Sequence, residues 1–387
     1  MSPSLLLRRC RAYDAIGGLS PRLIAVLLRD GRIDRVMPEP VEPSAEEILD
    51  ADGRVLAPGL IDIHIHGAGG ADTLEGTQDA LATMSQTLAR LGTTGFLATT
   101  VCDPARADAH VAVAAKAVGT DLGGARLLGL HLEGPFVNPI RRGGLPPWSV
   151  QPPSTRALDS LLALTGGTLR VMTIAPELEG SLPIIDRLAA DGIVAALGHS
   201  DADYDQAAAG FDAGITHVTH LWNAMRALHH RDPGPVTALL AHEGVTAELI
   251  ADGVHLHPTV VELTVKALGA ARCICVTDGM RTVGMPDGPY VFAGRDGETR
   301  HGTARYLDGT LIGTSVGLWA IARRFMRYSR CTLVEAIDSV AHGPARLLGM
   351  ENRLGRIAPG YDADLVLLDA DLEIYATIVG GKVIYRR

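Results

Sequence analysis

The chain has 387 residues, of which 47% are hydrophobic and 20% charged, and its formal net charge is −9. This composition is that of a globular protein with a sizeable core, and it excludes an intrinsically disordered or collagen-like chain. The negative charge argues against a broad nucleic-acid surface, and no apolar run reaches the roughly 18 residues of a membrane span.

Short strands with turn signals are expected at both ends of the chain. Residues 4–36 and 48–57 show alternating apolar positions, with a hairpin around Asp30-Gly31. The tail 362–387 alternates as well and turns at Gly380-Gly381. These segments predict a small β-sandwich domain that combines residues 1–57 with residues 352–387.

Short apolar runs alternate with helical patterns through the middle of the chain. Strands are expected at 60–67, 95–100, 127–134, 170–177, 193–200, 215–222, 247–253 and 273–279, with helices between them, as at 77–91, 104–118, 181–191 and 203–213. Asp103-Pro104 predicts the start of the second of these helices. Segment 281–313 is rich in glycine and turn signals, so a loop or a β excursion is expected after the eighth strand.

Eight strand–helix units in this order predict an α/β fold, a (β/α)8 barrel over residues 58–351. An open doubly wound sheet is the alternative. It is disfavoured because polar residues recur at the carboxyl ends of many strands, whereas a doubly wound sheet would gather them at one switch point.

These strand ends carry side chains that suit a metal ion. His64 and His66 project together, because alternate residues of a strand share a face. The other candidates at strand ends are Glu133, His199, His220 and Asp278. Imidazoles with a carboxylate suit Zn²⁺, with Fe²⁺ or another first-row divalent ion as alternatives, and one or two ions could bind. Because strand ends of a barrel meet at one mouth, the joint pattern predicts a metal centre there.

Taken alone, each residue also has an ordinary structural explanation. A His-x-His pair often packs in a core, and a carboxylate after an apolar strand, such as Glu133, often caps the next element. His131 and His217 lie just inside predicted ligand positions and are expected to be core or supporting groups. The run His229-His230-Arg231 is either a solvated loop or part of an anion site.

Several segments together carry a family resemblance from residue 50 to residue 370. They read PGLIDIHIHG, HLEGPF, GHSDADYDQ, THLWNAM followed by HHRDPG, IADGVH, VTDGM and GRIAPGYDADLVLLD. The chain resembles the amidohydrolase superfamily and, within it, the N-acetylglucosamine-6-phosphate deacetylases. HLEGPF and THLWNAM are much more specific than the His-x-His pair, which many amidohydrolases share.

The resemblance implies a role for each candidate. Glu133, His199 and His220 would hold one metal ion, with His64 and His66 placed to support a second. Asp278 would be the catalytic acid and base. Asn223, the backbone of Ala224, His255 and Arg231 would bind the phosphosugar substrate, and Arg231 would reach the phosphate in the neighbouring subunit of a homodimer. Some members of the family replace the histidine pair and use one metal ion, so retaining both histidines makes a two-metal site possible here.

The positions of the lysines restrict which amidohydrolases the chain can resemble. Some amidohydrolases bridge two metal ions with a carboxylated lysine at the end of the fourth strand. The three lysines here, Lys116, Lys266 and Lys382, all lie outside the predicted barrel strands. A lysine-bridged hydrolase is therefore disfavoured, and Glu133 is expected to supply the anionic ligand.

Two segments depart from the resembled family. Leu145 stands where the family has a substrate-binding histidine, and the run 312–318 reads IGTSVGL instead of a sequence close to AGSALTM. We therefore expect an intact hydrolytic centre with an altered substrate collar. The first hypothesis is deacetylation of N-acetylglucosamine 6-phosphate. Another N-acyl sugar, such as the galactosamine epimer, and a non-catalytic barrel scaffold are the alternatives.

The number and spacing of the cysteines indicate the cellular compartment in which the protein functions. They are Cys10, Cys102, Cys273, Cys275 and Cys331, an odd number without the spacing of a disulfide framework. Cys273 and Cys275 alternate in an apolar run, which predicts two buried thiols. The first residues hold three consecutive leucines before a double arginine, too few for the apolar core of a secretory signal. A cytoplasmic protein is expected.

Overall fold

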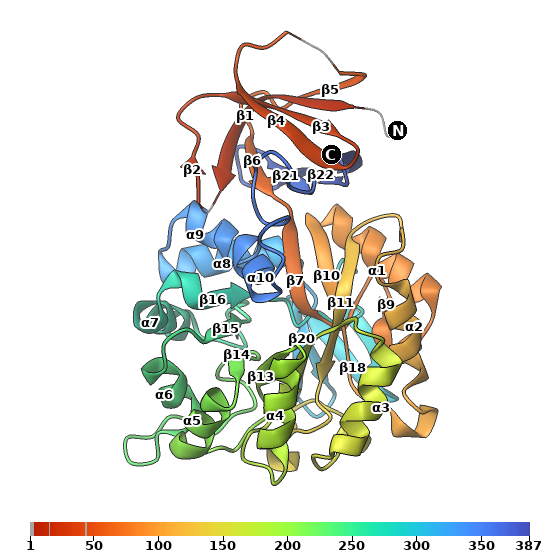
Figure 1. The fold of residues 1–387 in the computed structure, drawn as a ribbon, viewed down its shortest axis with the longest axis vertical. Coiled ribbons are helices and arrows are strands. Elements are labelled where there is room, and N and C mark those ends of the chain that lie inside the picture. Colours follow the sequence, from red (N-terminus) through yellow and green to blue (C-terminus); the bar gives the residue numbers. More distant parts are fainter. Residues whose placement is uncertain (1–3, 15, 43–44) are drawn as a thin grey trace.

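The computed structural model describes residues 4–14, 16–42 and 45–387. A small β domain built from both ends of the chain lies above a barrel of strands and helices (Figure 1). The last strand of the small domain before the barrel, β6, ends at Pro58, and the first barrel strand, β7, begins at Leu60.

Eight parallel strands of the described chain form the barrel in sequential order. They are β7 (Leu60–Ile65), β10 (Thr93–Thr100), β11 (Arg126–Glu133), β12 (Leu169–Ile174), β13 (Val194–Leu197), β14 (Ile215–Val218), β15 (Thr246–Leu249) and β16 (Cys273–Cys275). The Asp278 amide donates to the His64 carbonyl at 2.9 Å and the His66 amide to the Gly279 carbonyl at 2.8 Å, so the last strand segment returns to the first. The barrel prediction is confirmed, and the open doubly wound alternative is wrong.

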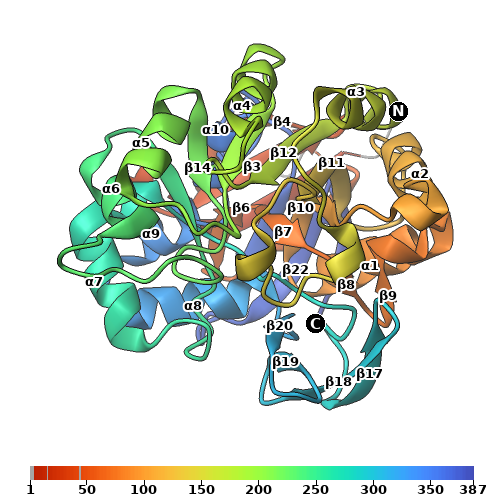
Figure 2. The same ribbon diagram turned by 90° about the horizontal axis from the view of Figure 1, so that it is seen from below.

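Helices surround the barrel and follow its strands in turn (Figure 2). They are α1 (Gln78–Arg90), α2 (Ala109–Ala117), α3 (Thr155–Thr165), α4 (Ser181–Ala190), α5 (Tyr204–Asp212), α6 (Gly234–Ala241), α7 (Pro258–Leu268), α8 (Leu318–Ser329), α9 (Leu333–Asp338) and α10 (His342–Leu347). No helix in the described part of the chain is both long and apolar enough to cross a membrane.

One predicted helix start is wrong. Asp103 precedes only a short 3-10 turn, Pro104–Arg106, and its side chain makes no capping bond there. The helix begins later, at Ala109. The Asp108 carboxylate accepts the Asp103 amide at 2.5 Å, and this local bond favours a loop where Pro104 alone would permit a helix.

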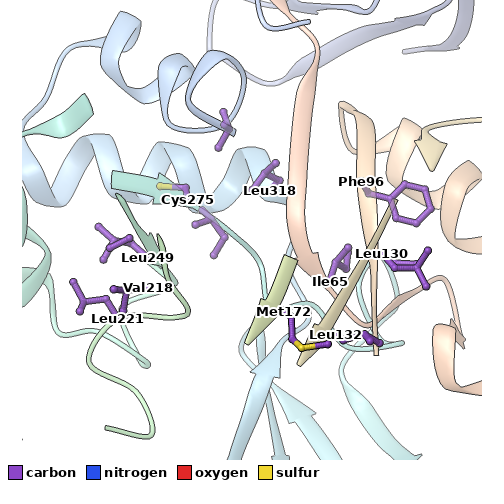
Figure 3. Close-up of a cluster of buried hydrophobic side chains, with 14 of the residues drawn as sticks. Ile65, Phe96, Leu130, Leu132, Met172, Val218, Leu221, Leu249, Cys275 and Leu318 are labelled. Atoms are coloured by element: carbon purple, nitrogen blue, oxygen red, sulfur yellow. The ribbon is translucent and has the colours of Figure 1, made fainter. Parts of the chain in front are cut away.

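Alternate residues of the barrel strands serve two apolar clusters. On β16, Cys273 and Cys275 pack with residues of the surrounding helices, whereas Ile274 joins Leu97 and Val171 in the barrel interior. Figure 3 shows part of the outer cluster, with side chains such as Phe96, Leu130 and Leu249. The interior becomes polar toward the carboxyl ends of the strands, where Glu248 and Thr173 are fully buried. The two clusters fix the strands whose ends carry the polar residues.

The small β domain has two layers joined by one strand. Its strands are β1 (Leu5–Asp14), β2 (Gly18–Leu19), β3 (Ile24–Arg29), β4 (Arg32–Pro38), β5 (Glu47–Asp50), β6 (Val55–Pro58), β21 (Leu365–Leu368), β22 (Ile374–Val379) and β23 (Lys382–Arg386). The first part of β1 pairs with β3 and β5, and its last residues pair with β6, which leads to β21, β22 and β23. Side chains of both layers, such as Leu7, Val26 and Leu367, share one core. The predicted hairpin around Asp30-Gly31 is present as β3 and β4.

Two further antiparallel units lie beside the barrel. The excursion after β16 is a four-stranded meander of β17 (Gly288–Phe292), β18 (Arg295–Arg300), β19 (Thr303–Tyr306) and β20 (Leu311–Thr314) (Figure 2). A short pair, β8 (Gly67–Ala68) and β9 (Ala71–Asp72), follows β7. The Thr314 amide donates to the Asp278 carbonyl at 3.0 Å, so the meander is attached directly to the strand end that carries Asp278.

Candidate metal centre and substrate cavity

Three of the predicted metal ligands converge at the carboxyl ends of β11, β13 and β14. Glu133 is the last residue of β11, and His199 and His220 each follow the end of a strand by two residues. Glu133 Oε1 lies 3.0 Å from His199 Nε2 and 3.1 Å from His220 Nε2, and the two imidazole nitrogens are 3.0 Å apart. All three side chains are buried.

This arrangement fits a divalent metal ion. His199 Nδ1 lies 2.9 Å from the Arg141 carbonyl oxygen. Because a carbonyl only accepts hydrogen bonds, Nδ1 carries the proton and the Nε2 lone pair is free to bind a metal. In a tetrahedral zinc site, donor atoms about 2.0–2.1 Å from the ion lie roughly 3.3 Å from one another. The observed separations near 3 Å are close to that value.

The other predicted ligands form a second group on the same carboxylate. His66 Nε2 lies 3.1 Å from Glu133 Oε2 and 3.5 Å from Asp278 Oδ1. His64 Nε2 lies 3.5 Å from Asp278 Oδ1 and is a buried nitrogen without a hydrogen-bond partner. Such an unpartnered nitrogen is costly unless a ligand satisfies it. Glu133 can therefore present one oxygen to each group, as a two-metal site would require.

The backbone at three of these positions is in a conformation that non-glycine residues rarely adopt. The φ angle is +48° at His199, +28° at His220 and +45° at Asp278. Each costs free energy relative to an ordinary extended residue, and the surrounding structure must enforce it. The left-handed backbone turns each side chain into the mouth immediately after its strand ends.

Opposing effects act on the ionisable groups of this cluster. Burial alone would raise the pKa of Glu133, but hydrogen bonds from the three imidazoles around it lower this pKa well below its usual range. Burial lowers the pKa of His131 to about 3, so that ring is neutral. Burial also opposes protonation of His64, yet Glu248 and Asp278 raise its pKa to about 10. Metal binding at His64 would therefore release a proton.

Glu248 belongs to the centre but was not among the sequence-predicted residues. Its Oε2 lies 2.8 Å from His64 Nδ1 and accepts the His220 backbone amide at 2.9 Å. His217 Nε2 lies 3.4 Å from Oε1. One fully buried carboxylate thus orients His64 with Nδ1 protonated and also fixes the backbone that presents His220. A glutamate inside a short buried strand is the sequence signal that could have found it.

His131 and His217 lie in the same buried layer. His131 contacts the Ile63 carbonyl at 3.0 Å and Thr173 Oγ1 at 2.9 Å, and His217 Nδ1 contacts Thr246 Oγ1 at 2.7 Å. Both nitrogens of His131 are thus engaged by the protein itself. This geometry suits the supporting role expected of these two histidines.

His255 is held by a second carboxylate, Asp252, which was not among the residues predicted from the sequence. Asp252 Oδ2 lies 2.8 Å from His255 Nδ1, and Oδ1 accepts the backbone amides of Val254 and His255 at 2.8 Å each. Burial would raise the pKa of Asp252, but the hydrogen bond with His255 lowers it. The ionised carboxylate therefore fixes Nδ1 as the donor and leaves Nε2 of His255 for a ligand.

A cavity of about 160 Å³ opens at the metal centre. Its lining includes the predicted residues His66, Glu133, His199, His220, Asn223, Ala224, His255 and Asp278, and also Leu145. Arg231 does not line it: this exposed residue follows His230, whose Nε2 lies 2.7 Å from the Arg231 guanidinium. Among the described residues, those lining the cavity include no lysine or arginine, so no permanently charged cationic side chain lies beside Glu133 and Asp278 in this cavity.

Comparison with known proteins places the chain among hydrolases. The sequence model described as "Amidohydrolase family" matches residues 55–384. N-acetylglucosamine-6-phosphate deacetylase of Bacillus subtilis (strain 168) is 39% identical over 363 residues, 92% of each chain. N-acetylgalactosamine-6-phosphate deacetylase of Escherichia coli O157:H7 is 36% identical over 344 residues, 88% of this chain and 91% of that protein. A mutant N-acetyl-D-glucosamine-6-phosphate deacetylase from Mycobacterium smegmatis, solved with N-acetyl-D-glucosamine-6-phosphate, superposes with a TM-score of 0.91 at 32% identity, covering 98% of this chain and 99% of that one.

Proposed function

The chain belongs to the amidohydrolase family, and on this premise we propose that it hydrolyses the acetamide of N-acetylglucosamine 6-phosphate to give glucosamine 6-phosphate and acetate. The observation that carries the proposal is the convergence of Glu133, His199 and His220 opposite Asp278 in one cavity. Relatives of that activity, matched over most of the chain, support the choice of substrate.

The metal-binding residues proposed are those of the two groups on Glu133. Glu133, His199 and His220 would hold one divalent ion, and His64 and His66 would support a second. Zn²⁺ is proposed, because two imidazoles and one carboxylate are ligands it commonly takes; Fe²⁺ would fit the same donors. When bound, such an ion lowers the pKa of water toward 7 and polarises a carbonyl oxygen.

The remaining residues position the substrate and move the proton. Asp278 would accept a proton from the attacking water and then deliver it to the amine that leaves. Its Oδ1 faces both His64 and His66, so it lies on the metal side of the cavity. Asn223 and the backbone of Ala224 would contact the sugar, and Nε2 of His255 would meet a hydroxyl group or the amide oxygen. Asp252 would keep that ring in one orientation.

The residue proposed to bind the substrate phosphate does not line the cavity of its own chain. Arg231 lies on an exposed loop, beside His229 and His230. We propose that the protein is a homodimer in which this guanidinium reaches the phosphate in the neighbouring site. A monomer in solution that still discriminates the phosphorylated from the unphosphorylated sugar would contradict this arrangement.

A reducing, cytoplasmic location is proposed together with this activity. The five cysteines are free in the structure, and four of them are buried. Free thiols are typical of proteins that function in a reducing compartment.

The N-acetylgalactosamine epimer is the second candidate substrate. Leu145, which lines the cavity, is an apolar residue where the resembled family has a substrate-binding histidine. A relative named as an N-acetylgalactosamine-6-phosphate deacetylase is 36% identical to this chain. The two sugars differ at one hydroxyl group, so the same catalytic residues would serve either one.

Acetate release tests the proposal directly. Protein loaded with Zn²⁺ or Fe²⁺ is incubated separately with the two N-acetylhexosamine 6-phosphates, and acetate and free amine are measured. We expect the higher kcat/KM with the glucosamine derivative and loss of turnover after chelation. Faster release from the galactosamine derivative would reverse the choice of epimer. No release from either sugar by protein with full metal content would overturn the proposed function.

A further inference from the structure

The lining of the cavity at the metal centre combines two chemically different sets of residues. The polar set comprises the metal ligands, Asp278, Asn223, the backbone of Ala224 and His255. The apolar set consists of Leu145, Met280, Phe292, Leu311 and Ile312. We call these five residues the apolar wall; three of them come from the β17–β20 meander and its turns.

The apolar wall is packed firmly and is tied to the catalytic segment. Met280 and Phe292 share a buried cluster with Tyr290 and Tyr306, against which Ile312 packs. The Tyr306 hydroxyl donates to the Gly144 carbonyl at 3.2 Å, which joins the meander to the loop that carries Leu145. A Cβ on Gly144 would lie 2.4 Å from Ile312 Cγ2, so these two segments are already in close contact. The wall therefore has little freedom to move away from a larger ligand.

The wall also lies close to the place where the amide must react. The rings of Phe292 and His66 meet edge to face, with their centroids 6.0 Å apart. β20 adjoins Asp278 so closely that a Cβ on Gly313 would lie 2.2 Å from the Asp278 carbonyl oxygen. An amide bound above Glu133 and Asp278 would thus have the apolar wall as its immediate neighbour on one side.

The three substituents of the amide carbon can be assigned to these surfaces. The oxygen must face the metal ligands, where charge develops during hydrolysis. The nitrogen leads to the sugar, whose hydroxyl groups need the hydrogen-bonding partners of the polar set. The acyl chain is the one apolar substituent, and the apolar wall is the one surface left for it.

We propose that the apolar wall is the acyl site of the enzyme and that Ile312 and Phe292 limit the acyl group to acetyl. This inference rests on the proposed deacetylase function and adds the residues that select the acyl chain. An open apolar surface would favour longer chains, because burial of each additional CH₂ is favourable. An apolar wall whose side chains are packed against the meander should instead exclude them.

The test compares acyl chains on one sugar phosphate. N-acetyl and N-butyryl derivatives of the sugar that the wild type deacetylates are assayed with wild-type protein and with Ile312→Ala. This substitution removes three carbon atoms from the wall, and butyryl adds two to the substrate. We expect the ratio of kcat/KM for butyryl over acetyl to rise by about tenfold or more, within the range of methylene discrimination in apolar pockets.

A matched control comes from the same meander. Val291 is the neighbour of Phe292 on β17, but its side chain points outward and is 48% exposed. Val291→Ala should leave the ratio unchanged. Phe292→Leu is the second variant and should also raise the ratio. Inhibition by butanoate relative to acetate, measured with the same proteins, reports the acyl site without turnover of the amide and should shift in the same direction.

The outcomes separate the two proposals. If Ile312→Ala and Phe292→Leu retain metal and slow both substrates equally, without a change in carboxylate inhibition, the wall contacts the sugar and the acyl assignment is overturned. If wild-type protein deacetylates neither hexosamine phosphate, the proposed function fails and not merely the acyl site. A raised ratio in both variants, with the Val291 control unchanged, supports the assignment.

Discussion

Buried carboxylates have different partners at the two ends of the barrel. At the mouth, Glu133, Asp278 and Glu248 face imidazoles, and the cavity lining includes no lysine or arginine among the described residues. At the other end, below the small β domain, Asp362 and Asp364 face arginines. Arg353 contacts Asp362 at 2.6 Å, and Arg126 contacts Asp364 at 3.1 Å.

The difference distinguishes a functional cluster from a structural one. A cavity of about 620 Å³ at the domain boundary is nearly four times the size of the one at the mouth, yet its buried Asp362 already has arginine partners. The smaller cavity is lined by Glu133 and Asp278 with no lysine or arginine beside them in the described part of the chain, and the buried His64 Nε2 next to Asp278 has no hydrogen-bond partner there. Cavity size alone would select the wrong end, whereas the balance of buried charge selects the mouth.

The largest effect is expected from removing the charge of one carboxylate at the mouth. We expect Asp278→Asn to lower kcat by a factor of about 10²–10⁴, because an amide cannot accept and return a proton. Metal content, measured by elemental analysis, should stay near that of the wild type. Asp296→Asn makes the same chemical change at an exposed position of β18 and should leave turnover intact. Near-wild-type turnover in Asp278→Asn would remove this residue from its proposed role.

A smaller effect is expected from the carboxylate behind the ligands. Glu248→Gln keeps the size of the side chain but offers His64 Nδ1 and the His220 amide a neutral, weaker acceptor. We expect the affinity for the divalent ion to fall by about 10–100-fold. Competition with a chelator of known affinity measures this directly.

Glu262→Gln is the matched control for Glu248→Gln. Glu262 lies on α7 and pairs with Lys266 on the surface, so its change should not affect metal affinity. If both variants bind metal as the wild type does, Glu248 does not orient the ligands and belongs with the structural carboxylates.

The sequence predicted the barrel and its strand ends because both follow from local pattern. Each buried strand is a short, mostly apolar run, and the polar residue at its end marks the mouth: Glu133 after LLGLHL shows this most clearly. Parallel order then places the strand ends together without further information. The candidate ligands came from this rule and not from any knowledge of distances.

What the sequence could not supply were contacts between distant segments. Glu248 lies 184 positions from His64, and nothing local distinguishes it from an ordinary strand residue except its charge. The left-handed backbone at His199 and Asp278 could not be predicted from the sequence, because residues other than glycine rarely adopt this conformation. Asp103 shows the opposite kind of error. Its local capping signal predicted the start of a helix, but the hydrogen bond from its amide to the Asp108 carboxylate favours a loop.

The smallest effect is expected from Asp364, at the end of the barrel below the small β domain, and it concerns stability. Burial raises the pKa of Asp364 to about 6 from its ordinary value of 3.8, although Arg126 and the Gly380 amide oppose the shift. Between these two values the folded protein retains a proton that the unfolded chain has lost. The contribution of this group to stability therefore falls as the pH rises from about 4 to about 6, by roughly 3 kcal/mol in all.

Asp364→Asn removes this titration. Urea unfolding of the wild type and the variant at several pH values should show the wild type losing stability relative to the variant between pH 4 and pH 6. Turnover per folded molecule should be the same in both, because Asp364 lies at the end of the barrel away from the metal centre. A difference in unfolding free energy that stays constant over this range would show that Asp364 is ionised throughout. The arginines at the domain boundary would then neutralise it as fully as they do Asp362.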